Sequence, residues 1–364
     1  MKLVYYKNLD GVRAIAALMV IFFHFFHEMS NELSPTLSII KKIASIGQTG
    51  VTLFFVLSGF LITRILINTK DTEGYFKNFY VRRTLRIFPL YYFFLVIYFF
   101  VSPLFLTINE FHFNDEFYYF TYLQGFARTF GWDVSGPNHF WSLAVEEHFY
   151  LFWPFVIFYV AKKNLGKIIL AIIILAILVR VILLNNNYSV FLFTFTRIDS
   201  LAIGAILALL ELKKLLTLKH IKYFIDLFVG LVVVTLLIWI LLAGEGSNYI
   251  QNLRYLLLSL VYFSMIGSLL CIPKEHGVNR LLETRFFQYT GKISYGLYVY
   301  HPLVFMFCVQ YLHTDYLILN LIIGTLITYV VAGLSYKYFE SQFLRLKKYF
   351  EYKKPNSLSQ PKEA

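Results

Sequence analysis

The chain has 364 residues, of which 58% are hydrophobic, 20% aromatic and only 15% charged. Charged residues make up about a quarter of an ordinary globular chain, so this composition excludes a soluble domain and predicts an all-α polytopic membrane protein. The formal net charge is +12, but the basic residues lie between apolar stretches. That spacing is typical of loops that set membrane topology and argues against a nucleic-acid partner.

Apolar windows predict a single bundle of about ten transmembrane helices. The expected spans are residues 12–26, 51–67, 87–106, 140–160, 168–184, 190–210, 224–242, 253–272, 293–312 and 317–339. An even number of spans places both termini on one side of the membrane. We expect one transmembrane domain over residues 1–345, followed by a polar tail over residues 346–364.

The basic residues indicate which side that is. Most Lys and Arg residues fall in segments 2–7, 64–86, 162–167, 213–222, 274–292 and 345–362. Positive charge is enriched in cytoplasmic loops, so we expect cytoplasmic termini in a multi-pass protein of the cell membrane. The two largest segments on the other side are residues 28–50 and 107–139. The second contains EFYYFTYLQGFA, which is too short to span and is predicted to be interfacial or re-entrant.

The first span, LDGVRAIAALMVIFFHFFH, carries Arg13 and His24. On a helix the eleven-residue step leaves them about 20° apart around the axis and ~16 Å apart along it. Ionisable groups in hydrocarbon are costly unless they face a polar interior, so the pair is a candidate functional site. The alternative is that Arg13 snorkels to the membrane edge and His24 hydrogen-bonds a neighbouring helix.

A basic cluster precedes the third span in YVRRTLRIFPLYY. Arg83 and Arg86 are spaced i, i+3 and share a helical face, and Arg82 completes a cationic group at the cytoplasmic mouth. The planar fork of a guanidinium suits phosphate. Topology alone also explains such a cluster.

The fourth span opens with NHFWSLAVEEHFYLFWP. Ser142, Glu146 and Tyr150 follow helical spacing and share a face, while Glu147 points about 100° away. If Glu146 lies near His24, the pair has the form of a general base and the carboxylate that orients it. The alternative is a structural carboxylate bonded to a neighbouring side chain.

Two later spans also carry polar side chains. Arg197 and Asp199 form a pair that can neutralise itself and is expected to line the same cavity, although a structural salt bridge explains it equally well. In GKISYGLYVYHPL, a set of polar residues is placed either to bind a polar ligand or to join helices. The set comprises Ser294, Tyr295, Tyr298 and His301.

These motifs together resemble the acyltransferase 3 family of integral-membrane O-acyltransferases, which includes enzymes that acetylate surface polysaccharides and O-antigen. The resemblance covers nearly the whole chain. It rests on Arg13 and His24 with ten residues between them, and on GVTLFFVLSGFLIT, RRTLRIFPLY, FWSLAVEEHFYLFWP, RIDSLAIG and GKISYGLYVYHPL, all in this order.

The resemblance implies a bundle of about ten membrane helices, a donor that is acetyl-CoA or another acyl-CoA, and a hydroxyl acceptor on a surface or lipid-linked glycan. It implies that His24 is the catalytic histidine, with Arg13 as its partner. It also implies that Arg83 and Arg86 are the essential cytoplasmic pair. Glu146 corresponds to the motif glutamate, preceded by Trp141 and Ser142.

The expected mechanism is direct acyl transfer. The CoA phosphates bind Arg82, Arg83 and Arg86, the pantetheine arm passes Arg13, and His24, oriented by Glu146, deprotonates the acceptor hydroxyl. Further substrate contacts are expected from Trp141, Ser142, Tyr150, Arg197, Asp199, Tyr298 and His301. No metal site and no permanently bound cofactor are expected.

Three alternatives remain open from the sequence. A secondary transporter or flippase also uses intramembrane His, Glu and Arg. An acyltransferase of this type can act on a small molecule in place of a glycan. A non-catalytic membrane scaffold would tolerate replacement of His24.

Overall fold

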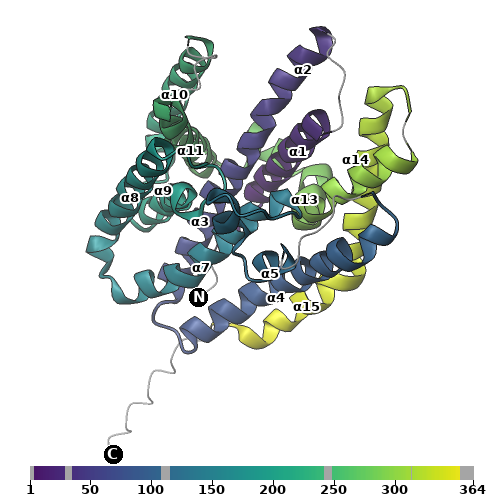
Figure 1. Cartoon of the computed structure of the whole chain (residues 1–364). Coiled ribbons are helices and arrows are strands. Elements are labelled where there is room, and N and C mark those ends of the chain that lie inside the picture. Colours follow the sequence, from purple (N-terminus) through teal and green to yellow (C-terminus); the bar gives the residue numbers. More distant parts are fainter. Residues whose placement is uncertain (1–3, 29–34, 108–114, 242–247, 313, 353–364) are drawn as a thin grey trace, which may run out of the picture.

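The computed structural model describes residues 4–28, 35–107, 115–241, 248–312 and 314–352. All the longer regular elements in this described part are α-helices, as the composition predicted (Figure 1). They are α1 (Asn8–Glu28), α2 (Pro35–Ser45), α3 (Gly50–Thr69), α4 (Tyr75–Val96), α5 (Asp115–Phe120), α6 (Gln124–Thr129), α7 (Trp141–Tyr159), α8 (Leu165–Asn185), α9 (Thr194–Leu212), α10 (Ile221–Leu241), α11 (Asn248–Cys271), α12 (Gly277–Leu282), α13 (Arg285–Tyr311), α14 (Leu317–Ser335) and α15 (Ser341–Arg345).

Seven helical segments among the described residues are long and apolar enough to cross a membrane. They contain α1, α3, α4, α8, α10, α11 and α14. Helices α7, α9 and α13 form where three further spans were predicted, and each has at least 19 residues. These three carry most of the ionisable and polar residues singled out above and fall outside the seven. The number of long apolar helices therefore identifies the chain as a multi-pass membrane protein. The expected total of ten spans stays a prediction.

The bundle is held by pairs of helices in close contact. Helix α1 packs on α13, α3 on α9, α8 on α9, and α10 on α11. The α3–α9 pair approaches through glycines: an added Cβ would lie 1.9 Å from the Leu201 carbonyl oxygen at Gly59 and 2.0 Å from the Val56 carbonyl oxygen at Gly204. Small residues allow this backbone approach, which is how membrane helices gain packing energy where burial from water contributes little.

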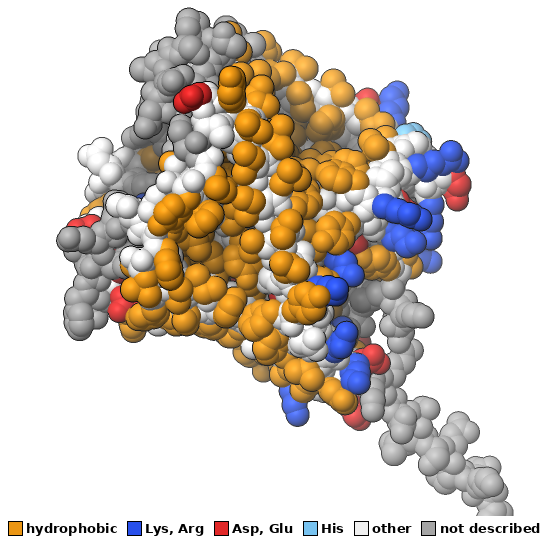
Figure 2. All heavy atoms as spheres, turned by 90° about the vertical axis from the view of Figure 1, so that its right-hand side faces the viewer, with side chains coloured by type: hydrophobic (Ala, Val, Ile, Leu, Met, Phe, Trp, Pro, Cys, Tyr) orange, Lys and Arg blue, Asp and Glu red, His pale blue; other side chains and the backbone are white. Residues whose placement is uncertain are grey.

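The outer surface carries the apolar side chains that a bilayer would cover. Along α14 one stripe at four-residue spacing stays exposed, from Ile318 at 70% through Leu326 at 61% to Val330 at 59%. Figure 2 shows the broad hydrophobic face to which this helix belongs, with Lys and Arg gathered along one edge of it. A continuous apolar face bordered by basic residues on one edge fits a helix bundle with one positively charged end.

The two segments predicted to lie opposite the basic end contain short helices. Residues 28–50 include α2, which the sequence analysis did not predict and which leaves Ile39 and Ile43 exposed. The EFYYFTYLQGFA stretch forms α5 and α6, which pack against α4 and α7. The Gln124 amide donates to the Phe140 carbonyl at 3.0 Å, and the Tyr91 hydroxyl donates to the Tyr119 carbonyl at 2.7 Å. These bonds tie the stretch to the bundle.

Both ends of the described chain lie beside the connection between α3 and α4. Arg64, near the end of α3, donates to the Val4 carbonyl at 2.9 Å. Asn78, near the start of α4, donates to the Glu351 carbonyl at 3.2 Å. The start of the predicted tail forms a 3₁₀ turn, η8 (Leu346–Phe350), against α4, and residues 353–364 lie outside the described residues. The two ends are therefore at the same end of the bundle.

Candidate functional site

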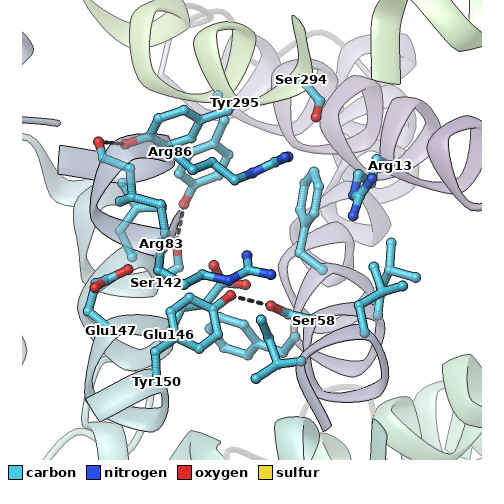
Figure 3. Close-up of a pocket in the computed structure, with 18 of the residues that line it drawn as sticks. Arg13, Ser58, Arg83, Arg86, Ser142, Glu146, Glu147, Tyr150, Ser294 and Tyr295 are labelled. Carbon is cyan, nitrogen blue, oxygen red and sulfur yellow. Dashed lines mark hydrogen bonds between the residues drawn. The ribbon is translucent and has the colours of Figure 1, made fainter. Parts of the chain in front are cut away.

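A cavity with charged walls opens between α1, α3, α4, α7 and α13 (Figure 3). We call it the arginine cavity, because three guanidinium groups enter it, those of Arg13, Arg83 and Arg86. Glu146 and Glu147 also line it. Hydroxyl groups complete its polar wall, and they belong to Ser58, Ser142, Tyr150, Ser294, Tyr295 and Tyr298.

The three arginines before the third span point in different directions in the structure. Arg83 and Arg86 point into the arginine cavity (Figure 3), and neither makes a hydrogen bond or ion pair with a described residue. Arg83 instead lies over the Tyr150 ring, 5.4 Å from its centroid. Arg82 is rotated by about 100° on the helix and turns away. It donates to the Lys347 carbonyl at 2.8 Å and to the Phe350 carbonyl at 3.3 Å, so the expectation that it joins a phosphate site is not met.

Arg13 enters the arginine cavity from the side opposite Arg83 and Arg86 (Figure 3). Its guanidinium forms an ion pair with Asp10, one turn earlier on α1. Glu146 faces the hydroxyls of Tyr150 and Ser58, which are hydrogen-bonded to each other. The motif residues Arg13, Arg83 and Glu146 therefore converge on one cavity, although they come from three helices.

A second cavity adjoins the first. We call it the histidine cavity, because His24 and His139 line it. Polar side chains and aromatic rings surround them: Gln48, Arg128, Asn138, Trp141, Ser189, Phe191 and Tyr298. Tyr298 and Val51 line both cavities. The Tyr298 hydroxyl lies 2.5 Å from the Ser142 hydroxyl and donates to the His139 carbonyl at 2.7 Å, which holds its ring at the boundary.

The structure does not pair His24 with Glu146, and that part of the expected mechanism is wrong. His24 Nδ1 lies 3.0 Å from the Val20 carbonyl oxygen and 3.1 Å from Nε2 of His301, which is fully buried on α13. Glu146 lines the arginine cavity, and His24 lines the histidine cavity. His301 was expected to contact substrate but lines neither cavity; it lies behind His24.

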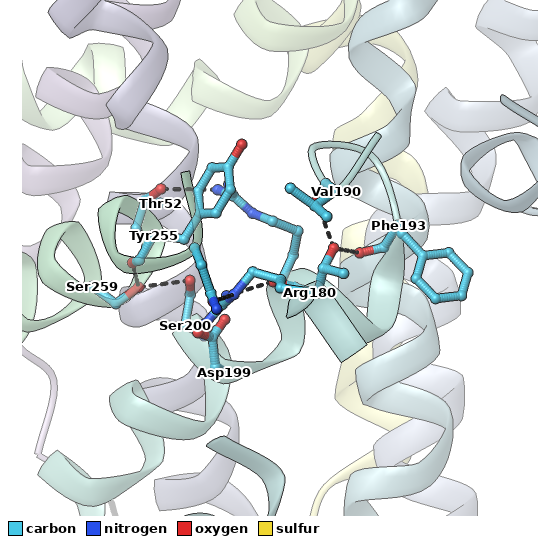
Figure 4. A network of polar contacts seen from close by, with 11 residues as sticks. Thr52, Arg180, Val190, Phe193, Asp199, Ser200, Tyr255 and Ser259 are labelled. Atoms are coloured by element: carbon cyan, nitrogen blue, oxygen red, sulfur yellow. Dashed lines mark hydrogen bonds and ion pairs between the residues drawn. The ribbon is translucent and has the colours of Figure 1, made fainter. Parts of the chain in front are cut away.

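Arg197 and Asp199 do not form the expected pair and line neither cavity. Residues two apart on a helix face different directions. Asp199 binds Arg180 of α8, with the guanidinium 2.8 Å from the carboxylate (Figure 4). Arg197 donates to Thr52 at 3.0 Å and lies 4.1 Å from the centroid of the Tyr255 ring. Both residues belong to a polar network inside the bundle.

Two important residues were missed in the sequence. Arg180 is a lone cation within an apolar run, which is itself a signal of a buried partner. His139 comes two residues before the Trp141 motif, and its Nε2–H donates to the Val299 carbonyl at 3.1 Å. Within the described residues no group of three or more His, Cys, Asp or Glu side chains is placed to hold a metal ion.

The chain is similar to known proteins over nearly its whole length. Residues 6–337 match the family model of an acyltransferase domain. The chain is 27% identical over 94% of its length to a protein of Staphylococcus aureus (strain COL) named as a candidate O-acetyltransferase. It is 27% identical over 92% of its length to YrhL of Bacillus subtilis, named as a candidate peptidoglycan O-acetyltransferase. It is 25% identical over 93% of its length to the O-acetyltransferase OatA of Staphylococcus aureus.

These relatives are longer proteins. The chain spans 58%, 54% and 57% of their respective lengths, a little over half in each case. No solved structure matches the chain.

Proposed function

The chain belongs to this acyltransferase family, and we propose that it is a multi-pass membrane O-acyltransferase. In this proposal it transfers an acetyl group from cytoplasmic acetyl-CoA to a hydroxyl of a cell-surface or lipid-linked glycan. Its relatives are named as O-acetyltransferases, one of them for peptidoglycan, which supports an oxygen nucleophile on a glycan. The observation that carries the proposal is the pair of adjoining cavities, one lined by three arginines and the other by two histidines.

The arginine cavity is the donor site of this proposal, and it opens toward the cytoplasm. Arg83 and Arg86 lie near the middle of α4, and the start of this helix is at the end of the bundle that holds both described chain ends. Positive charge at that end of the bundle supports a cytoplasmic orientation in the cell membrane. CoA is anionic and is made in the cytoplasm, so its phosphates meet these guanidinium groups first.

Arg83 and Arg86 suit phosphate because their donors are not used elsewhere in the described structure. Arg13 is already paired with Asp10, so its charge is partly neutralised. Charge-assisted bonds from a guanidinium to a phosphate are roughly twice as strong as neutral hydrogen bonds. The proposed donor contacts are therefore Arg83 and Arg86, with Arg13 farther along the path toward His24.

The acyl group meets the acceptor at the boundary that Tyr298 forms. His24 takes the proton of the acceptor hydroxyl, the oxygen bonds to the thioester carbonyl carbon, and the carbon–sulfur bond breaks. The proton then passes from His24 to the departing CoA thiolate, so the imidazole returns to its neutral form. Direct transfer needs no acyl-enzyme.

The histidine cavity is the acceptor site in this proposal. Trp141 and Phe191 offer flat apolar faces, while Arg128, Asn138 and Gln48 offer hydrogen bonds. A few polar groups among aromatic rings are the usual lining of a small-molecule site, and a sugar ring presents both kinds of surface.

The proposal is tested in inside-out membrane vesicles with radiolabelled acetyl-CoA. We expect label in the glycan or lipid-linked fraction from the unaltered protein, and little or none from His24→Ala or Arg83→Ala at equal protein level. Arg82→Ala is the matched control, because its side chain contacts the η8 carbonyls and not the cavity. Full activity in His24→Ala would overturn the base assignment. Transport of a solute without any acyl transfer would favour the transporter alternative.

A further inference from the structure

His24 and His301 are hydrogen-bonded to each other, and each ring is also hydrogen-bonded to a backbone carbonyl. These two carbonyls determine which ring nitrogen donates the proton and which accepts it. His301 Nδ1 lies 3.0 Å from the Leu297 carbonyl oxygen. A carbonyl only accepts, so His301 carries its proton on Nδ1, and its Nε2 is an unprotonated acceptor in the neutral ring. This Nε2 is the atom that lies 3.1 Å from Nδ1 of His24.

The same reasoning applies to His24. Its Nδ1 lies 3.0 Å from the Val20 carbonyl oxygen, which also only accepts, so the proton of His24 is on Nδ1 as well. That N–H is shared between the Val20 carbonyl and His301 Nε2. The remaining nitrogen of His24, Nε2, therefore has a free lone pair, and its ring lines the histidine cavity. An unprotonated nitrogen on a ring that lines the cavity is what a general base requires.

We propose that His301 is the positioning residue of this enzyme, because it fixes the tautomer and ring orientation of His24. This inference rests on the proposed function, in which His24 is the base. The hydrogen bond that one ring nitrogen makes decides which nitrogen carries the proton. His301 thus has the place that the sequence analysis gave to Glu146. An imidazole acceptor also stabilises the imidazolium form of His24, since a charged donor makes a stronger bond than a neutral one.

The fold supports this role. Helices α1 and α13 run in the same direction: Gly291 lies against the Asp10 backbone, where an added Cβ would be 2.0 Å from the carbonyl oxygen, and His301 meets His24 farther along. His301 is fully buried, and its ring packs on Phe305 with centroids 6.0 Å apart. A buried ring held by backbone and packing orients its partner with little freedom.

Two substitutions of His301 test its two ring nitrogens separately. Asn places an amide nitrogen near Nδ1 and no atom near Nε2, whereas Gln places an amide oxygen near Nε2. We expect His301→Gln to keep kcat within about tenfold and His301→Asn to lower it by about 10²-fold or more, the range of general-base effects. The KM for acetyl-CoA should stay unchanged in both variants, because His301 does not line the arginine cavity. His148→Gln is the control, since that imidazole binds Thr194 at 2.8 Å outside both cavities.

The purified variants are compared by steady-state kinetics and thermal unfolding, with His24→Ala alongside. Equal kcat in His301→Asn and His301→Gln at unchanged melting temperature would overturn the proposal. If His301→Asn does not fold, His301→Gln provides the test. The proposal is also overturned if His301→Gln has a normal melting temperature but a kcat as low as that of His24→Ala. Activity in His24→Ala contradicts the proposed function, whereas an inactive His24→Ala beside a fully active His301→Asn contradicts only the role of His301.

Discussion

The Arg180 guanidinium donates to the Asp199 carboxylate across 2.8 Å, and neither side chain is exposed to solvent. Arg180 also donates to the Thr196 carbonyl at 2.7 Å and to Asn252 at 3.0 Å (Figure 4). The pair thus connects α8, α9 and α11. Its geometry and burial identify it as a structural ion pair and not as a substrate contact.

Breaking this pair from one side is expected to destabilise the protein strongly. Asp199→Leu leaves the Arg180 cation buried without a counter-ion, which costs about 3–5 kcal/mol. The double variant Arg180→Met with Asp199→Leu should be more stable than Asp199→Leu alone, because both charges are gone. Thermal unfolding in detergent measures both, with Lys167→Met on the exposed part of α8 as the control. A double variant no more stable than the single one would contradict the pairing.

Arg83→Ala should raise the KM for acetyl-CoA by about 10- to 150-fold, the equivalent of one charged hydrogen bond of roughly 1.5–3 kcal/mol. The same change at Arg82 should leave this KM within about twofold, because Arg82 binds the η8 carbonyls. Steady-state kinetics with varied acetyl-CoA distinguishes the two arginines. An equal rise in the KM for acetyl-CoA in both variants would show that the different orientations of Arg82 and Arg83 do not matter for donor binding.

Arg128→Ala should raise the KM for the glycan acceptor and leave the KM for acetyl-CoA unchanged, since Arg128 lines only the histidine cavity. The expected change is about tenfold, because Arg128 is half-buried and the loss of one charge-assisted hydrogen bond costs roughly 1.5 kcal/mol. Two-substrate kinetics provides the readout. If acetyl-CoA affinity falls instead, the assignment of donor and acceptor to the two cavities is reversed.

Gly204→Ala should reduce the yield of folded protein. Its Cβ would lie 2.0 Å from the Val56 carbonyl oxygen, so α3 and α9 must move apart, and overpacking of this kind costs about 1–3 kcal/mol or more. Gly230→Ala on α10 is the matched control, because nothing lies within 4 Å of its Cβ position. Monodisperse protein after size-exclusion chromatography is the measurement. Equal yields from the two variants would contradict the close packing of α3 on α9.

Much of the architecture was predictable from the residues because a bilayer allows few choices. Backbone groups in hydrocarbon must bond within their own segment, so long apolar runs become helices. The helical period then predicted that Arg83 and Arg86 share a face, as they do in the arginine cavity. The order of motifs was enough to identify the family, and the domain match over residues 6–337 confirms it.

Residue order alone predicted the long helices, the helical face on which each motif residue lies and the family. Which of these faces contact one another became clear only from the folded chain. His24 binds His301, which is 277 positions away, and Asp199 binds Arg180 on another helix. Local periodicity describes one helix at a time. Contacts between helices depend on their relative rotation and depth, and close packing at glycines such as Gly59 and Gly291 sets both.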